Sequence, residues 1–258
     1  MKKLIFIVPI IILLVIGFVV TKVYINKGEE YNLNDKLEEE KTSNQVDSYE
    51  VYSYITDDVL KNSSESETTA LFRTSYTPEY MIENSDVIAL VTIITIDGAS
   101  TEYSSMFGMT YGSMMINNTI FGNDIKEQVV EYIKPGGRIS LEDWEKAQPQ
   151  AANEKREYLR QQSGSEIDKQ NTYLNIVLGN DIELEAGKTY LAYLNYSDTF
   201  QKYEIIGLGN GLREINIEKK TSVTYQNYDI NSLKIKNNDT KEWEDLDTYI
   251  QENIEAYK

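Results

Sequence analysis

The feature that most constrains this chain is an uninterrupted apolar run near its amino terminus. Residues Leu4 to Val20 read LIFIVPIIILLVIGFVV, seventeen uncharged positions with two lysines before them and one soon after. As an α-helix this run is about 26 Å long, close to the hydrocarbon thickness of a bilayer. It is longer than the apolar region of a cleaved signal peptide, the alternative, and it ends without paired small residues. We therefore predict an uncleaved membrane anchor over residues 1–25, which enters the lipid bilayer through residues 4–20.

The flanking charges predict the orientation of this anchor. Positive charge accumulates on the cytoplasmic side of a membrane span. The amino terminus, Lys2 and Lys3 precede the run, whereas Lys22 and Lys27 follow it. Beyond residue 20 there are 23 basic and 42 acidic residues, a balance of −19, so anionic lipid repels this part of the chain. We expect a single-pass protein of the cell membrane, with a cytoplasmic N-terminus and an extracytoplasmic C-terminal domain.

Composition excludes several classes of chemistry. The chain has no cysteine and no histidine, which removes disulfides, thiol nucleophiles, Ser-His-Asp catalysis and the usual zinc, haem and iron–sulfur sites. A net charge of −17 argues against nucleic acid as a partner, because phosphate binding needs a basic face. Clusters of acids occur without the spacing of a calcium-binding loop. We predict no cofactor and no metal.

Composition also divides the chain into four parts. After the anchor, residues 26–77 are polar and acidic, a composition typical of a flexible stalk. Within it, SYEVYSYI (residues 48–55) is either a short strand or a helical turn. Residues 78–220 are richer in strand-forming patterns and are predicted to form a β domain. Residues 221–258 are a C-terminal extension with an amphipathic helix.

The pattern within residues 78–220 predicts a mainly β (α+β) fold. Strands are expected at Asp86–Asp97, Thr110–Phe121, Glu127–Ile133, Thr189–Tyr196 and Tyr203–Ile217. Ser140 and Asp143 have the spacing of a capping box, which opens a helical stretch that ends near Gln162. Asn210-Gly211 lies between two alternating runs, as in a two-residue hairpin turn. A helix between the third and fourth strands is typical of a small, antiparallel oligonucleotide/oligosaccharide-binding (OB) barrel.

Two groups of side chains are candidates for contact with a partner. Twenty tyrosines are many for this length, and four of them on neighbouring predicted strands form a possible stacking platform for sugar or peptide: Tyr190, Tyr193, Tyr196 and Tyr203. Core and rim packing is the alternative. The C-terminal helix carries an apolar stripe that docks on the barrel or captures a partner protein: Trp243, Leu246, Ile250, Ile254 and Tyr257.

Part of the chain resembles a known kind of protein. The resemblance is carried by Ser85-Asp86 before a β-branched strand, Gly122, PGGRIS from Pro135, LEAGKTYL from Leu184, and Tyr203 to Gly211. Over about residues 80–217 the chain resembles uncharacterised exported proteins of low-GC Gram-positive bacteria. It is more distantly similar to netrin-like and metalloproteinase-inhibitor barrels. The resemblance implies a barrel of OB type and no particular activity.

Two functions are compatible with these patterns. The first is a membrane-anchored extracytoplasmic binding domain without an identifiable catalytic site, whose partner is a cell-envelope protein or glycan. The alternative is a hydrolase of envelope glycan or peptide that uses paired carboxylates. Two facing acids in one pocket, one of them desolvated, favour the hydrolase.

Overall fold

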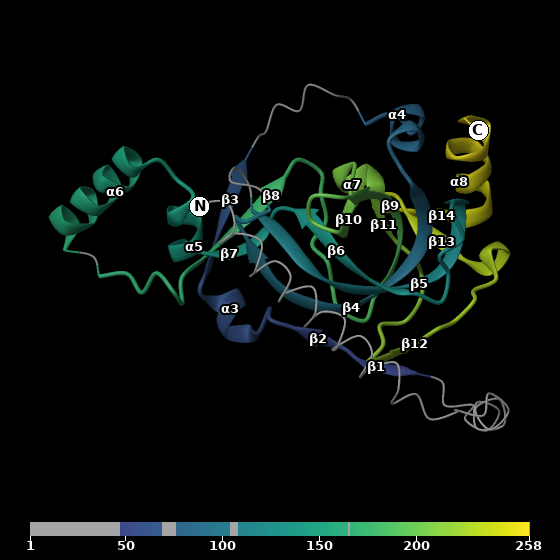
Figure 1. The fold of residues 1–258 in the computed structure, drawn as a ribbon, viewed down its shortest axis with the longest axis horizontal. Coiled ribbons are helices and arrows are strands. Elements are labelled where there is room, and N and C mark those ends of the chain that lie inside the picture. Colours follow the sequence, from purple (N-terminus) through teal and green to yellow (C-terminus); the bar gives the residue numbers. More distant parts are fainter. Residues whose placement is uncertain (1–46, 69–75, 104–107, 165, 258) are drawn as a thin grey trace, which may run out of the picture. The chain divides into compact units, whose positions relative to one another are not determined.

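Five strands form a closed ring at the centre of the fold (Figure 1). The computed structural model describes residues 47–68, 76–103, 108–164 and 166–257. The strands are β4 (Val87–Ser100), β5 (Met109–Gly122), β6 (Val129–Pro135), β9 (Thr189–Ser197) and β10 (Lys202–Ile205). The pairs β4–β5, β5–β6, β9–β10 and β4–β9 are antiparallel, and β6–β10 is parallel. The structure is mainly β with some helices, as predicted, but its sheets are mixed rather than only antiparallel.

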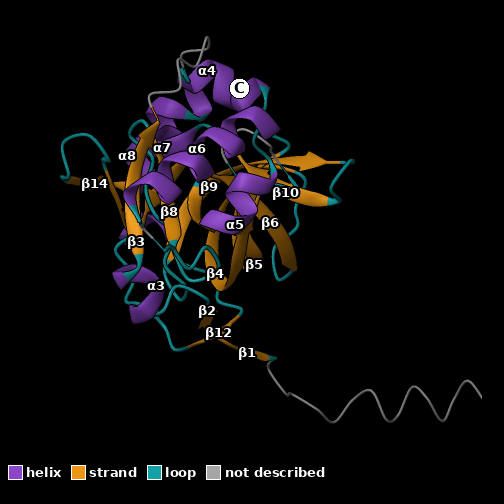
Figure 2. Ribbon diagram, turned by 90° about the vertical axis from the view of Figure 1, so that its left-hand side faces the viewer, coloured by secondary structure: helices purple, strands orange, loops and turns teal. Residues whose placement is uncertain are grey.

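Two further short strands join this sheet, and the other elements surround it (Figure 2). β11 (Leu212–Glu214) pairs with β9, and β2 (Tyr52–Ser53) pairs with β4. Three smaller sheets comprise β3 (Ser63–Thr68), β8 (Tyr173–Leu178) and β7 (Gly137–Ser140); β1 (Ser48–Glu50) and β12 (Ser222–Thr224); and β13 (Lys234–Lys236) and β14 (Trp243–Asp245). The helices are α3 (Asp57–Lys61), α4 (Pro78–Glu83), α5 (Leu141–Lys146), α6 (Gln150–Ser163), α7 (Leu208–Gly211) and α8 (Leu246–Asn253), with the 3₁₀ turns η1 (Ile230–Ser232) and η2 (Glu255–Tyr257).

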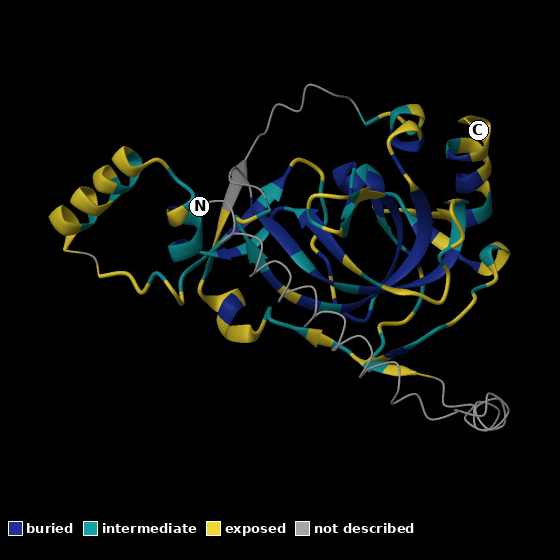
Figure 3. Ribbon diagram, in the orientation of Figure 1, coloured by how far each residue is buried: buried dark blue, intermediate teal, exposed yellow. Residues whose placement is uncertain are grey.

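Alternate residues of the ring strands fill its interior. β4 begins with a β-branched run in which both faces are buried, so it reads as an almost continuous apolar segment. Side chains from all five ring strands meet in one apolar cluster, which includes Val91, Met114, Tyr132, Tyr190 and Ile205. These residues are at most 2% exposed. The inside of the ring is therefore a packed core (Figure 3).

A second core lies on the outer face of β4 and β9. Ile88 and Leu90 of β4 pack there with Leu191 and Tyr193 of β9, because these positions alternate with those that point inward. Helices α4 and α8 supply the opposite layer, with Met81, Ile82, Leu246, Tyr249 and Ile250. The two helices therefore cover one wall of the ring.

The segment between β6 and β9 contains the predicted helical excursion. Ser140 caps α5: its Oγ accepts a hydrogen bond from the Asp143 amide at 3.1 Å and donates one to the Asp143 carboxylate at 2.9 Å. The predicted N-cap at Ser140 is therefore confirmed, but the Asp143 carboxylate accepts from the Ser140 hydroxyl instead of from the Ser140 backbone N–H, as a full capping box requires. Helix α6 has no buried residue, and it projects away from the ring (Figures 1 and 3). It ends at Gly164, which adopts a left-handed conformation.

The structure corrects two sequence predictions. Residues 47–68 lie in the predicted stalk, yet β1, β2 and β3 in this stretch pair with β12, β4 and β8. Of the two alternatives for residues 48–55, β1 and β2 show the strand. Long-range backbone hydrogen bonds order this polar sequence, and local composition does not reveal them. The remainder of the described stalk, residues 76–77, leads directly into α4.

The predicted hairpin at Asn210-Gly211 is also wrong. Both residues belong to the short helix α7. β10 and β11 each pair antiparallel with β9, at successive positions along it. They therefore run in the same direction, and a two-residue turn cannot join them.

The predicted anchor falls outside the described residues. None of the helices in the described ranges is long and apolar enough to cross a membrane. Residues 1–46 are not among those ranges.

Candidate functional site

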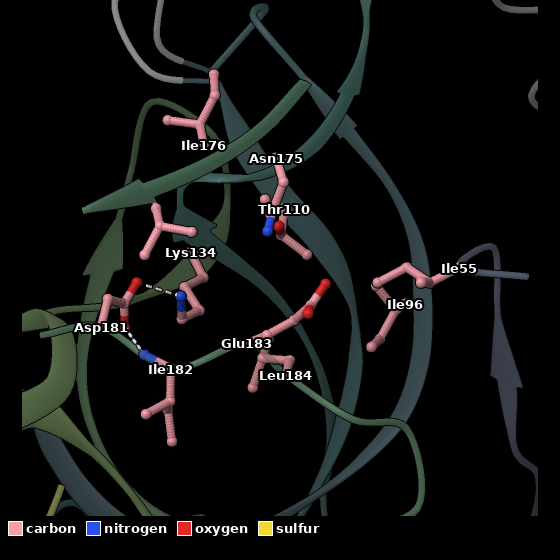
Figure 4. Close-up of a pocket in the computed structure, with 12 residues that line it drawn as sticks. Ile55, Ile96, Thr110, Lys134, Asn175, Ile176, Asp181, Ile182, Glu183 and Leu184 are labelled. Carbon is pink, nitrogen blue, oxygen red and sulfur yellow. Dashed lines mark hydrogen bonds and ion pairs between the residues drawn. The ribbon is translucent and has the colours of Figure 1, made fainter. Parts of the chain in front are cut away.

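A small cavity lies where one end of the ring meets the β3–β8–β7 sheet (Figure 4). Its volume is about 30 Å³, which is room for about two water molecules. The lining mixes apolar side chains with buried polar ones: Ile55, Ile96, Thr110, Lys134, Gly137, Asn175, Ile176, Val177, Asp181, Ile182, Glu183 and Leu184. Sites for small organic ligands are at least about ten times larger. The cavity as it stands is a water-sized space.

An ion pair between Lys134 and Asp181 crosses this cavity (Figure 4). The two side chains are only 7% and 5% exposed. Asp181 also accepts a hydrogen bond from the amide of Ile182 at 2.8 Å. The ion pair therefore connects β6 to the chain that follows β8.

That following chain, residues 181–186, is here called the strap. Its apolar residues Ile182, Leu184 and Ala186 pack into the core of the ring, and they alternate with acids. Glu183 accepts two hydrogen bonds from Arg138, at 2.7 and 3.1 Å. Glu185 lies 2.7 Å from Lys188 and 3.2 Å from Lys219. The strap closes the end of the ring with apolar side chains and holds its acids in ion pairs.

The acids of the cavity do not form the facing pair that the hydrolase alternative requires. Asp181 pairs with Lys134 and Glu183 with Arg138. Burial raises the pKa of a different carboxyl, that of Glu204 on β10, which is not part of the cavity lining. Within the described ranges, no group of three or more acids has the arrangement of a metal site.

The four predicted platform tyrosines do not share one surface. Tyr190 and Tyr193 are each 2% exposed and belong to different cores, inside and outside the ring. Burial raises the pKa of both hydroxyls. Tyr196 and Tyr203 do meet, with ring centroids 5.2 Å apart in an edge-to-face arrangement. Two of the four residues therefore fill cores, and the other two form an aromatic pair.

A different aromatic group joins two loops of the ring. Tyr103, in the loop after β4, lies edge-to-face against Tyr111 of β5 at 5.7 Å and against Phe200 of the β9–β10 turn at 5.4 Å. All three side chains are half-buried. We call this group the aromatic patch. Its members are far apart in the sequence, so periodicity could not find it; the only hint is an aromatic residue in each of two polar loops.

Carboxylates lie near Tyr111 of the aromatic patch. The pKa of Tyr111 is raised, first by burial and then by the nearby Tyr103, Asp97 and Glu102. Thr101 donates a hydrogen bond from its hydroxyl to the backbone oxygen of Asp143 at 3.3 Å, which ties this loop to α5. The patch is therefore an aromatic surface in an acidic setting.

The predicted C-terminal stripe is divided between core and solvent. Leu246, Ile250 and Ile254 are buried in the outer core against β4 and β9. Trp243 lies on β14 instead of the helix, and it and Tyr257 are 41% and 47% exposed. Tyr249, which was not part of the prediction, is also buried. The helix thus docks on the ring through three of the five stripe residues.

A cluster of charges fixes the excursion helices. Burial alone raises the pKa of Glu145, but hydrogen bonds from Arg160 and Lys169 outweigh it, so this pKa lies below its usual value. Arg156 lies 3.6 Å from the same carboxylate and stacks over Trp144 at 4.7 Å. These contacts link α5, α6 and the chain after α6.

The comparisons with known proteins leave the family undetermined. No family model, no curated protein and no solved structure matches this chain. The fold and the site define the class only as a mainly β protein with helical additions.

Proposed function

We propose that this chain is a membrane-anchored extracytoplasmic binding domain whose partner is a protein or glycan of the cell envelope. Residues 4–20 hold it in the bilayer, and the acidic remainder of the chain lies outside the cell. The strand order supports an OB-type barrel. In chain order the ring strands are β4, β5, β6, β9 and β10, and α5 and α6 lie between the third and the fourth.

The aromatic patch is the observation that carries this proposal. OB barrels bind ligands on the face of their second and third strands, between the loops that follow the first and the fourth. In this chain those two loops contribute Tyr103 and Phe200, and the second strand contributes Tyr111. Half-buried aromatic rings offer a large contact area at low entropic cost.

The packed interior supports a ligand site on the outside. Core side chains from all five strands fill the ring, and the strap closes one end with Leu184 and Ala186, which are 4% and 5% exposed. A ligand cannot enter such an interior without displacing this core. A partner therefore contacts the outer surface, where the aromatic patch lies.

Two experiments test the proposal. Protease added to intact protoplasts should remove the chain beyond residue 25; protection of that part contradicts the exported orientation.

For binding, the full chain in detergent is sedimented with purified cell envelopes. Phe200→Ala should weaken co-sedimentation about tenfold, the equivalent of 1.4 kcal/mol. The control is Tyr158→Ala, on a residue of α6 that is 59% exposed; equal effects of both variants contradict the proposal.

The same envelope preparation separates binding from hydrolysis. A binding domain leaves the envelope material intact, whereas a hydrolase releases soluble fragments with time. Release that depends on Asp181 or Glu183 favours the carboxylate-dependent hydrolase.

A further inference from the structure

A second, open hollow lies beside the turn between β5 and β6. Its volume is about 410 Å³, which is within the range of small-ligand sites. It is separate from the aromatic patch, since no residue of that patch contributes to its lining: Asn118, Thr119, Ile120, Phe121, Gly122, Asp124, Lys126 and Asn227. The lining carries one carboxylate and one ammonium group, which balance each other.

One wall of the hollow is set by the amide of Asn118, which is 9% exposed. Asn118 Nδ2 donates to Asn227 Oδ1 at 2.6 Å and to the backbone oxygen of Tyr228 at 3.0 Å, and its Oδ1 accepts from the Tyr228 amide at 3.1 Å. The Asn118 side chain therefore uses both N–H groups internally. It fixes the carbonyl side of Asn227, so the exposed Asn227 amide presents its Nδ2 donor group for other contacts.

Another part of the lining is fixed by residues at the end of β5 and in the turn that follows it. Thr119 Oγ1 accepts a hydrogen bond from the amide of Ile125 at 3.3 Å. Lys126 Nζ lies 3.1 Å from Asp124 Oδ2, and Asp124 Oδ1 accepts from the Lys126 amide at 3.3 Å. The hydrogen bond from Lys126 holds the pKa of Asp124 below its usual value. This part of the lining presents acceptors and donors together without net charge.

Gly122, which also lines the hollow, cannot be replaced by a larger residue. Gly122 has φ +87°, and a Cβ there would lie 1.9 Å from the backbone oxygen of Asp86. The end of β5 therefore packs directly against the start of β4. Phe121 and Ile120 beside it are half-buried and pack against the outer core. The lining thus combines polar groups with a close-packed and partly apolar stretch of β5.

We infer that this hollow binds a neutral, polyhydroxylated ligand, namely one sugar ring of a carbohydrate. Each sugar hydroxyl both donates and accepts, which matches amide, carboxylate and ammonium groups held side by side. The apolar lining residues Ile120 and Phe121 suit the C–H face of the ring. The carboxylate of Asp124 repels an anion and the ammonium group of Lys126 repels a cation, so a charged ligand gains no net attraction. The prearranged walls reduce the entropy lost on binding.

A matched series of sugars tests this inference. Ligand-observed saturation-transfer NMR on the full chain in detergent is recorded with glucose, N-acetylglucosamine, cationic glucosamine and anionic glucose 6-phosphate. We expect saturable binding of the two neutral sugars with a Kd of about 10 mM, a weak affinity. Absence of binding by both neutral sugars, or tighter binding of either charged sugar, overturns the inference.

Variants locate the binding. Asn227→Ala, and separately Asp124→Ala with Lys126→Ala, should weaken binding of the neutral sugars at least tenfold. The double change leaves the net charge unaltered, and exposed ion pairs contribute little to stability. Asn123→Ala, on an exposed neighbour outside the lining, is the matched control and should bind as the wild type does. If Phe200→Ala abolishes sugar binding while Asn227→Ala leaves it unchanged, the sugar binds at the aromatic patch and the inference is wrong, although the proposed function stands.

Discussion

Lys134 of β6 and Asp181 of the strap form an ion pair inside the protein, where each side chain is less than 10% exposed. Removal of one partner leaves a buried charge without compensation, which costs about 3–5 kcal/mol. We therefore expect Lys134→Met to lower the free energy of unfolding by this amount, measured by urea denaturation of the full chain. The double variant Lys134→Met/Asp181→Leu should return close to the wild-type value, because it removes both charges. Equal losses in the single and double variants contradict a coupled pair.

The C-terminal helix stabilises the outer core through particular members of its stripe. Ile254 is fully buried and Tyr257 is 47% exposed, although both belong to the same apolar stripe. Ile254→Ala should lower the free energy of unfolding by about 2–5 kcal/mol, and Tyr257→Ala by about 0.5 kcal/mol or less. Urea denaturation measures both. Similar values for the two variants show that the helix does not dock as the structure has it.

Glu204 makes stability depend on pH. Burial raises its pKa above the ordinary 4.5, so the folded state holds this proton more tightly than the unfolded state does. The contribution of Glu204 is therefore most favourable below pH 4.5 and is lost as pH rises through the folded-state pKa. Glu204→Gln should raise the melting temperature at pH 7 and have little effect at pH 3. A melting temperature lowered by the same amount at both pH values rules out the desolvated carboxylate.

Alanine substitutions at two glycines with positive φ distinguish the cost of steric crowding from the cost of backbone strain. Gly136 has φ +79°, and a Cβ there would lie 2.6 Å from the backbone oxygen of Ile176. Gly179 has φ +59° and open space around it. Both alanine variants are strained by about 1–2 kcal/mol. Gly136→Ala should be destabilised by about 1–3 kcal/mol more, since its methyl group cannot fit. Thermal unfolding compares the two, and an equal loss is the outcome that contradicts the observed packing.

Local patterns predicted the parts of the fold that depend on neighbouring residues. The run after Asp86 forms a strand because its β-branched residues are buried on both faces. Ser140 caps its helix through Asp143 because the bonded atoms lie within one turn of helix. Thr189–Ser197 is a central strand, and its apolar character on both faces had indicated this.

Pairing between distant segments determined the features of the fold that local sequence patterns did not predict. Residues 63–68 read as polar linker, yet they form β3 beside β8, more than a hundred residues later. Asn210-Gly211 is favourable for a hairpin turn. However, β10 and β11 both pair antiparallel with β9 and so run in the same direction as each other. Tyr190 and Tyr193 lie three residues apart on one strand, so alternation already places them on opposite faces; the distant segments that bury each face as a core are what the local pattern does not show. The aromatic patch depends on closure of the ring, which brings Phe200 to Tyr103.

Hydrogen–deuterium exchange of the full chain, with and without solubilised envelope fragments, tests the binding function most directly. Bound partner should slow amide exchange in residues 101–103, in residues 109–113 of β5 and in the 198–202 turn, because these segments carry the aromatic patch. Exchange in α6, which has no buried residue, should be unchanged. Protection confined to α6, or no protection in any of these segments, contradicts a ligand surface at the aromatic patch.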